Sequence, residues 1–118
     1  MGMKRIAIDF DGVLCDPQNV EPGFKMGNPI LGAQDSIRKL WAQGWYIIIF
    51  TVRGGLPKHV EEWLKFFDIP FNEVTNIKPN DVAFFVDDHA LRFEGQWDET
   101  LAAIEFRHKE YMRTKGEK

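Results

Sequence analysis

The chain has 118 residues, of which 44% are hydrophobic and 14% aromatic, a composition typical of a folded rather than a disordered protein. Fifteen Lys and Arg residues against eighteen Asp and Glu residues give a formal charge of −3, which argues against a strongly basic nucleic-acid binder. The single cysteine, Cys15, excludes an internal disulfide and a cysteine-rich zinc site. Because this length suits one compact core, we expect a single domain over residues 1–118.

The sequence favours neither secretion nor insertion into a membrane. Residues 1–5 are too few and too polar to form a signal peptide before the first apolar run. The longest apolar runs have five to six residues, as at 45–50, whereas a helix needs roughly 20 to span a bilayer. We therefore expect a soluble, cytoplasmic protein with no membrane partner.

Three short apolar runs predict buried strands. They lie at Ile6–Ile8 with Phe10, at Trp45–Phe50 and at Val82–Val86, and in each run apolar side chains would point to both faces of a sheet. The run Phe71–Thr75 is a weaker candidate for a short strand at the edge of that sheet.

Apolar residues recur at helical spacing in three other stretches. The predicted helices lie around Ala33–Trp41, Leu56–Phe67 and Leu101–Tyr111, with Gly44 as a stop after the first and Pro57 in the first turn of the second. Buried strands separated by helices indicate βαβ units with right-handed crossovers. The sequence therefore predicts an α/β fold with a parallel sheet.

Polar residues stand at the ends of the predicted strands. The first strand is followed by Asp9-Phe10-Asp11-Gly12, the second by residues 51–55 and the third by Asp87-Asp88-His89, while Lys78-Pro79 precedes the third. In parallel sheets, ligands bind beyond the carboxyl ends of the strands. We expect these residues to converge on one edge of the sheet.

The convergent residue types suit a divalent cation beside a phosphoryl group. Carboxylates packed closely repel one another, and a hard cation removes that repulsion; oxygen ligands with room for waters suit Mg²⁺. Lysine, arginine, a threonine hydroxyl and glycine-rich backbone suit the anion. Asp9 and Asp11 lie roughly 6–7 Å apart along an extended strand, so one carboxylate can stand behind the phosphorus and the other beside the leaving oxygen.

The motifs Asp9-Phe10-Asp11-Gly12-Val13, Thr51, Lys78 and Asp87-Asp88, in this order and at these strand ends, resemble those of the haloacid dehalogenase (HAD) superfamily. Residues 51–55, 78–88 and 92–97 look like a small cap-free branch of that superfamily. The resemblance implies a three-layer Rossmann-like (HAD-like) parallel sheet flanked by helices, with no separate cap domain.

The resemblance also implies a phosphatase mechanism. Asp9 is then the nucleophile that forms an aspartyl-phosphate, and Asp11 protonates the leaving alcohol and later deprotonates the attacking water. Mg²⁺ is held by Asp9, by the backbone carbonyl of Asp11, by Asp87, and by Asp88 either directly or through water.

The remaining motif residues are assigned to the phosphate. Thr51 and Lys78 hold its oxygens, and Gly12 and Val52 offer backbone N–H groups. Arg53 has no fixed role in the family, and we predict that it contacts the substrate or the phosphate, with a structural salt bridge as the alternative.

The connections between the predicted strands and helices are too short to indicate which substrate binds. The segment Asp16–Leu31, about fifteen residues rich in Pro and Gly, is expected to be a loop that overhangs the cleft and cannot form a domain. Residues 51–78 leave room for one helix and a short strand only. The expected partner is a phosphorylated small molecule or macromolecular end, with nucleic acid only as a substrate, and a homo-oligomer remains open.

Other interpretations of the same residues remain open. A receiver-like signalling domain also gathers carboxylates, threonine and lysine around Mg²⁺, but keeps its phosphoaspartate as a signal. A catalytically silent metal- or phosphate-binding protein would keep the same cleft. Asp9 and Asp11 could form only a strand-end turn, and Lys78 and His89 could lie in solvated loops.

Overall fold

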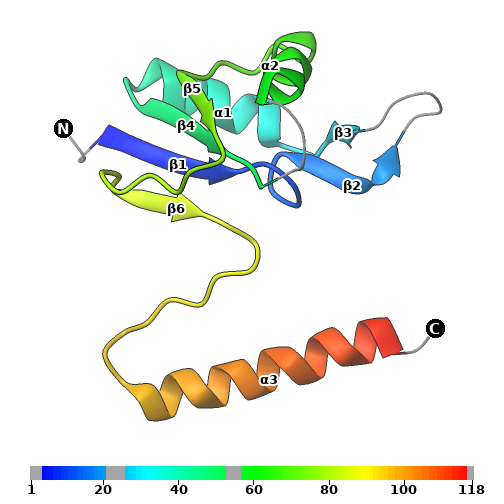
Figure 1. Cartoon of the computed structure of the whole chain (residues 1–118), viewed down its shortest axis with the longest axis vertical. Helices are drawn as coiled ribbons and strands as arrows, with labels where there is room; N and C mark the ends of the chain where they lie inside the picture. The colour runs from blue at the N-terminus through cyan, green and yellow to red at the C-terminus, as the bar shows by residue number, and fades with distance from the viewer. Residues whose placement is uncertain (1–3, 21–25, 53–56, 117–118) are drawn as a thin grey trace. The chain divides into compact units, whose positions relative to one another are not determined.

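The computed structural model describes residues 4–20, 26–52 and 57–116. The chain divides into two compact units, Met1–Asp88 and His89–Lys118. The first unit contains the sheet and two of the three described helices, and the second unit contains the third helix (Figure 1).

A parallel sheet of four strands organises the first unit. Its strands are β1 (Arg5–Asp9), β4 (Tyr46–Phe50), β5 (Glu73–Thr75) and β6 (Phe84–Val86). Their order is β5-β4-β1-β6, and each neighbouring pair is parallel. The predicted strands are therefore confirmed, including the edge position expected for residues 71–75.

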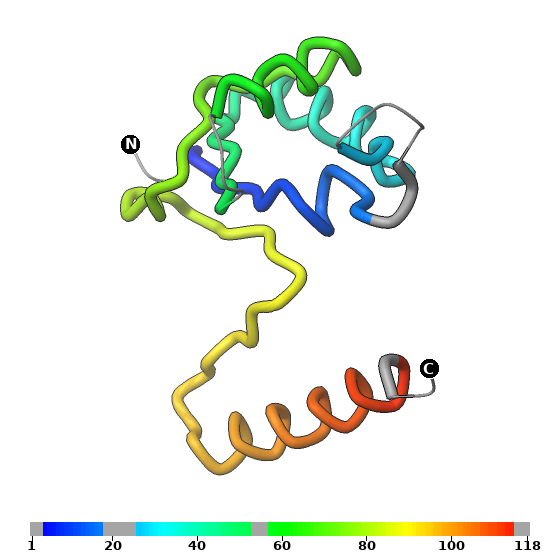
Figure 2. Tube along the Cα trace, turned by 45° about the vertical axis from the view of Figure 1, so that its right-hand side comes forward, coloured from blue at the N-terminus to red at the C-terminus, as the bar shows by residue number. Residues whose placement is uncertain are grey.

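Helices α1 (Ala33–Ala42) and α2 (Pro57–Phe66) share one hydrophobic core with the sheet (Figures 1 and 2). Ile6 and Ile8 of β1 pair in register with Ile47 and Ile49 of β4, so the four side chains point to the same face. The helices contribute the remaining buried apolar residues of this core, which include Ala33, Ile37, Val60, Trp63 and Leu64. The predicted Rossmann-like α/β fold, a parallel sheet flanked by helices, is confirmed.

The ends of both helices follow from local sequence. At the end of α1, Gly44 adopts a left-handed φ of 88°, and its N–H donates to the carbonyl of Trp41 at 3.0 Å. Proline suits the first position of α2, where its missing N–H costs no helical bond. After α2, the N–H of Ile69 returns to the carbonyl of Leu64 at 2.8 Å.

The segment 16–31, predicted to be a loop, contains part of an antiparallel hairpin. Strand β2 (Cys15–Val20) pairs with β3 (Gly27–Pro29). Cys15 pairs with Pro29 and Val20 with Gly27, and the register shifts between these two pairs. The indole N–H of Trp63 donates to the carbonyl of Gly27 at 2.8 Å, which ties the hairpin to α2. This hairpin was not predicted from the sequence because β2 contains Pro17 and lacks alternating apolar residues.

The prediction that residues 82–86 form a buried strand is wrong in its burial. The three residues of β6 are exposed: Phe84 by 60%, Phe85 by 45% and Val86 by 41%. Among the described strands, β6 pairs only with β1 and lies at the edge of the sheet. An apolar run alone cannot distinguish an edge strand from a central one.

The second unit contains helix α3 (Trp97–Gly116) and the segment before it. The rings of Phe93 and Trp97 lie 5.2 Å apart, and Arg107 Nη1 donates to the carbonyl of Ala90 at 3.3 Å. Asp98 and Glu99 lie in the first turn of α3, where negative charge favours a helix N-terminus, and the helix extends beyond the predicted range Leu101–Tyr111 at both ends.

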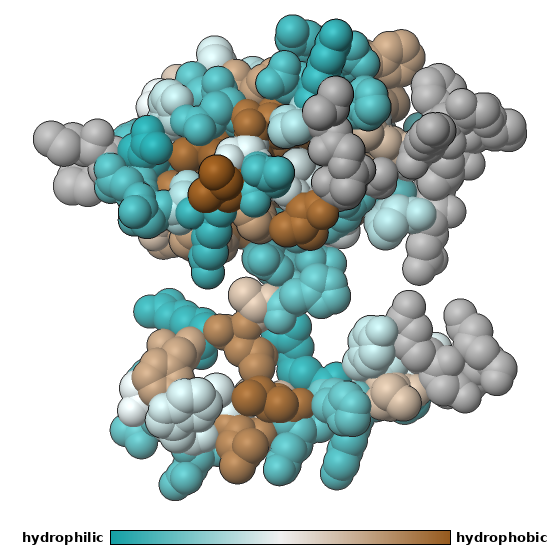
Figure 3. All heavy atoms as spheres, viewed as in Figure 1, coloured by the Kyte–Doolittle hydropathy of each residue, from teal (hydrophilic) through white to brown (hydrophobic). Residues whose placement is uncertain are grey.

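Apolar side chains lie at the surface of the second unit, as Figure 3 shows. They include Leu101, Ile104 and Tyr111, which the sequence places on one helical stripe. Within the described part of the chain, no helix is both long enough and apolar enough to cross a membrane.

Candidate metal and phosphate site

The strand registers bring the predicted motifs to one edge of the sheet. Asp9 is level with Phe50 of β4, and Ile8 is level with Val86 of β6. Thr51 and Asp87 therefore follow the neighbouring strands on either side of the end of β1. The backbone supports this arrangement, because the N–H of Phe10 donates to the carbonyl of Phe50 at 3.1 Å.

Three carboxylates meet at this edge. Asp9, Asp87 and Asp88 each offer one oxygen atom, and the three atoms lie within 4.8 Å of one another. Asp9 is half-buried, whereas Asp87 and Asp88 are exposed. Oxygen ligands on opposite sides of Mg²⁺ lie about 4.2 Å apart, so this donor set fits a hard divalent cation with open positions for water.

The pKa of Asp9 is raised from 3.8 to about 6, chiefly by burial. The charge of Asp87 is the next cause of the rise, and Asp88 contributes through its charge and a hydrogen bond. The N–H of Phe10, 3.0 Å from Oδ1 of Asp9, opposes the rise. A cation among the three groups would stabilise the ionised form, which is the chemical reason to expect one there.

The loop after β1 is tight and lies against the acidic pair. The N–H groups of Leu14 and Cys15 both donate to the carbonyl of Phe10 at 3.0 Å. Gly12 adopts φ +85°, and its N–H donates to the carbonyl of Cys15 at 2.9 Å. A Cβ atom built on Gly12 would overlap the carboxylate of Asp88, lying 2.9 Å from its Cγ.

Asp11 lies in the same loop, two residues beyond Asp9. It is half-buried and forms an isolated bridge with Cys15. The three-carboxylate cluster formed by described residues does not include its side chain. This is compatible with a carboxylate kept for proton transfer and a metal contact made by the backbone carbonyl.

Thr51 and Val52 follow β4 on the other side of Asp9. Thr51 is 3% exposed, and its N–H donates to the carbonyl of Thr75 at 2.9 Å. Val52 is exposed, so its side chain does not anchor the loop. Arg53, predicted to contact the substrate or phosphate, lies outside the described residues.

Lys78 precedes β6, and its ammonium group lies 5.1 Å from the ring centroid of Phe85. Phe85 lies in β6, two residues before Asp87. Both Lys78 and Phe85 are exposed, and this cation–π contact was not expected from the sequence.

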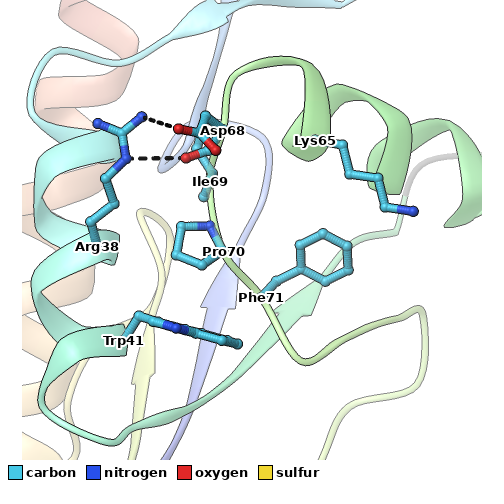
Figure 4. Close-up of a pocket in the computed structure, with 7 residues that line it drawn as sticks. All are labelled: Arg38, Trp41, Lys65, Asp68, Ile69, Pro70 and Phe71. Atoms are coloured by element: carbon cyan, nitrogen blue, oxygen red, sulfur yellow. Dashed lines mark hydrogen bonds and ion pairs between the residues drawn. The ribbon is translucent and has the colours of Figure 1, made fainter.

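A separate concave surface of about 500 Å³ lies where α1 and α2 end (Figure 4). Arg38 and Trp41 of α1, Lys65 of α2 and residues 68–71 line it, and Arg38 Nε donates to the carbonyl of Asp68 at 3.1 Å. In a βαβ unit the end of the helix lies at the amino edge of the next strand. This hollow is therefore at the edge of the sheet opposite the three carboxylates.

Comparisons with known proteins establish the fold only. No family model and no curated protein matches the chain. A solved structure, that of a conserved protein from Bacteroides thetaiotaomicron, is similar with a TM-score of 0.59. The two chains are 20% identical, and the similarity covers 87% of this chain and 90% of the other.

Proposed function

We propose that this chain is a Mg²⁺-dependent phosphomonoester hydrolase of the HAD superfamily, in its small cap-free branch, acting through an aspartyl-phosphate on Asp9. The observation that carries the proposal is the meeting of Asp9, Asp87 and Asp88 within 4.8 Å, at strand ends that also position Thr51. These groups come from three separate motifs along the sequence, in the order that the resemblance requires.

The reaction has two displacements at phosphorus. In the first, an Asp9 oxygen attacks phosphorus, the bond from phosphorus to the ester oxygen breaks, and Asp11 gives its proton to the departing alcohol. In the second, Asp11 takes a proton from a water molecule, whose oxygen attacks phosphorus and releases the Asp9 carboxylate. The products are an alcohol and inorganic phosphate.

The other residues hold and orient the reacting groups. Mg²⁺, held by Asp9, Asp87, Asp88 and the backbone carbonyl of Asp11, supplies positive charge that neutralises phosphate oxygens. Thr51 donates a hydrogen bond to the phosphate from a buried position, which keeps its hydroxyl fixed. Lys78 supplies positive charge to the phosphate oxygens, and Val52 offers a backbone N–H group. The N–H of Gly12, which was also predicted to serve the phosphate, instead donates to the carbonyl of Cys15.

One observation also favours a receiver-like signalling domain. The acidic pair Asp87-Asp88 and the single Asp9 lie on neighbouring strands, as the metal-binding pair and the phosphate acceptor of such a domain would. The two functions differ in the fate of the phosphoryl group. A hydrolase releases it repeatedly, whereas a receiver retains one phosphoryl group per chain.

Turnover of p-nitrophenyl phosphate by the purified chain tests the proposal. We expect many turnovers per chain with Mg²⁺, loss of activity in EDTA and recovery on adding Mg²⁺. A single persistent labelling with a small phosphodonor would favour the receiver, and metal binding without labelling or turnover would favour a silent binding protein. Phosphorylated metabolites, a 3′-phosphorylated oligonucleotide and a phosphopeptide then define the substrate class.

A further inference from the structure

Gly12 occupies a position where the carboxylate of Asp88 leaves no room for a side chain. A Cβ atom at residue 12 would overlap Oδ2 of Asp88 and lie 2.9 Å from its Cγ and 3.3 Å from its Oδ1. Non-bonded carbon and oxygen atoms do not approach so closely without displacement of one of them. The Asp88 carboxylate therefore fills the space that any other residue at position 12 would need.

We propose that Gly12 is a positioning residue of the metal site. By lacking a side chain, it admits the Asp88 carboxylate to the space beside Asp9, and it thereby makes Asp88 a direct ligand together with Asp9 and Asp87. This inference rests on the metal ion of the proposed function, but it does not depend on phosphate hydrolysis.

The two partners of this contact differ in their freedom to move. Gly12 is held by its hydrogen bond to Cys15 and lies in a loop whose residues Phe10, Leu14 and Cys15 are at most 2% exposed. Asp88 is exposed and follows an exposed edge strand. A side chain at position 12 would consequently displace Asp88 rather than the loop, and the metal would lose a ligand.

Gly44 provides a matched control. Its φ of +88° is close to the +85° of Gly12, so alanine suffers the same backbone strain at both positions. No described atom lies within 4 Å of a Cβ built on Gly44. Gly44→Ala therefore reproduces the strain of Gly12→Ala without the contact to Asp88.

The experiment measures binding of Mn²⁺, which prefers oxygen ligands as Mg²⁺ does, by electron paramagnetic resonance of the full chain. We expect Gly12→Ala to weaken Mn²⁺ binding at least about tenfold and Gly44→Ala to change it less than about twofold, with a similar fall in Tm for both. In an Asp88→Ala background, Gly12→Ala should change Mn²⁺ affinity less than about twofold, because the clash is gone.

Three results would overturn the inference. They are wild-type affinity in Gly12→Ala, an equal loss on adding Gly12→Ala to Asp88→Ala, and a wild-type chain that binds no Mn²⁺. A wild-type chain that binds Mn²⁺ but hydrolyses no phosphomonoester contradicts only the hydrolase proposal, so the two failures are distinguishable.

Discussion

Strand β1 lies between two neighbours that are alike in sequence and unlike in burial. In β4, Ile47, Ile48 and Ile49 are each at most 1% exposed, whereas the three residues of β6 are 41–60% exposed. β4 has a strand on each side and lies against the core formed with α1 and α2, while β6 pairs with β1 alone among the described strands. The buried apolar residues of the sheet therefore come from β1 and β4 and not from β6.

The same contrast continues at the ends of these strands. The residue after β4, Thr51, is buried, and the residues after β6, Asp87 and Asp88, are exposed. Asp9 lies between the buried Thr51 on one side and the exposed carboxylates of Asp87 and Asp88 on the other. Mg²⁺ keeps several waters when proteins bind it, so the exposed side suits the metal and the buried side suits a fixed phosphate.

Replacing Asp9, the residue between the two sides, should have the largest effect on activity. Asp9→Asn should lower kcat/KM at least about 1,000-fold, because an amide cannot act as the nucleophile. The variant should fold, since asparagine matches the shape of a half-buried aspartate, and its circular dichroism should match wild type. Asp35→Asn, which changes an exposed carboxylate on α1, is the matched control and should leave turnover unchanged. Near-wild-type activity in Asp9→Asn would show that another residue is the nucleophile.

The two sides should respond differently to Mg²⁺. Asp87→Asn removes a ligand, so the Mg²⁺ concentration at half-maximal activity should rise about 10- to 100-fold, with activity recovering in excess Mg²⁺. Thr51→Val removes a buried hydrogen-bond donor, so kcat/KM should fall about 100-fold at every Mg²⁺ concentration. Magnesium titrations of both variants make the comparison. Recovery of Thr51→Val by excess Mg²⁺ would contradict the division into a metal side and a phosphate side.

The stability of the two neighbouring strands should differ as their burial does. Ile49→Ala leaves a cavity in the core and should lower the free energy of unfolding by about 2–5 kcal/mol. Val86→Ala removes methyl groups that are already partly hydrated and should cost less than about 1 kcal/mol. Urea denaturation monitored by circular dichroism measures both values. Equal losses would show that β6 is covered in solution.

Most of the sheet could be predicted from apolar runs, and part of the site followed from it. Once Ile6–Ile8 and residues 45–50 are assigned to parallel strands, the residues after them must share an edge, and Asp9 indeed meets Asp87 and Asp88. Burial of β6 was wrongly predicted because exposure depends on the neighbours that a strand acquires, which its own sequence does not encode.

The remaining errors concern contacts between distant residues. The β2–β3 hairpin is tied to α2 by a hydrogen bond from Trp63, far along the chain, to Gly27. From the sequence, Gly12 was predicted only to offer a backbone N–H group. Its steric contact with Asp88 could not be predicted, because it depends on how the two loops meet in the fold. Two features of the sequence could have indicated this contact. They are Gly12, which directly follows the aspartates of the first motif, and Asp88, the second aspartate of the last motif.

The smallest predicted effect concerns the pH dependence of stability without metal. The pKa of Asp9 is about 6 in the folded chain against an ordinary 3.8, so the folded state holds this proton more tightly than the unfolded state. Stability should therefore rise as the pH falls from about 6 toward 4, the opposite of an aspartate in a salt bridge. In Asp9→Asn this contribution is absent. Thermal unfolding in EDTA between pH 4 and 7 measures the difference between the two chains, and parallel Tm profiles would show that folding does not raise the pKa of Asp9.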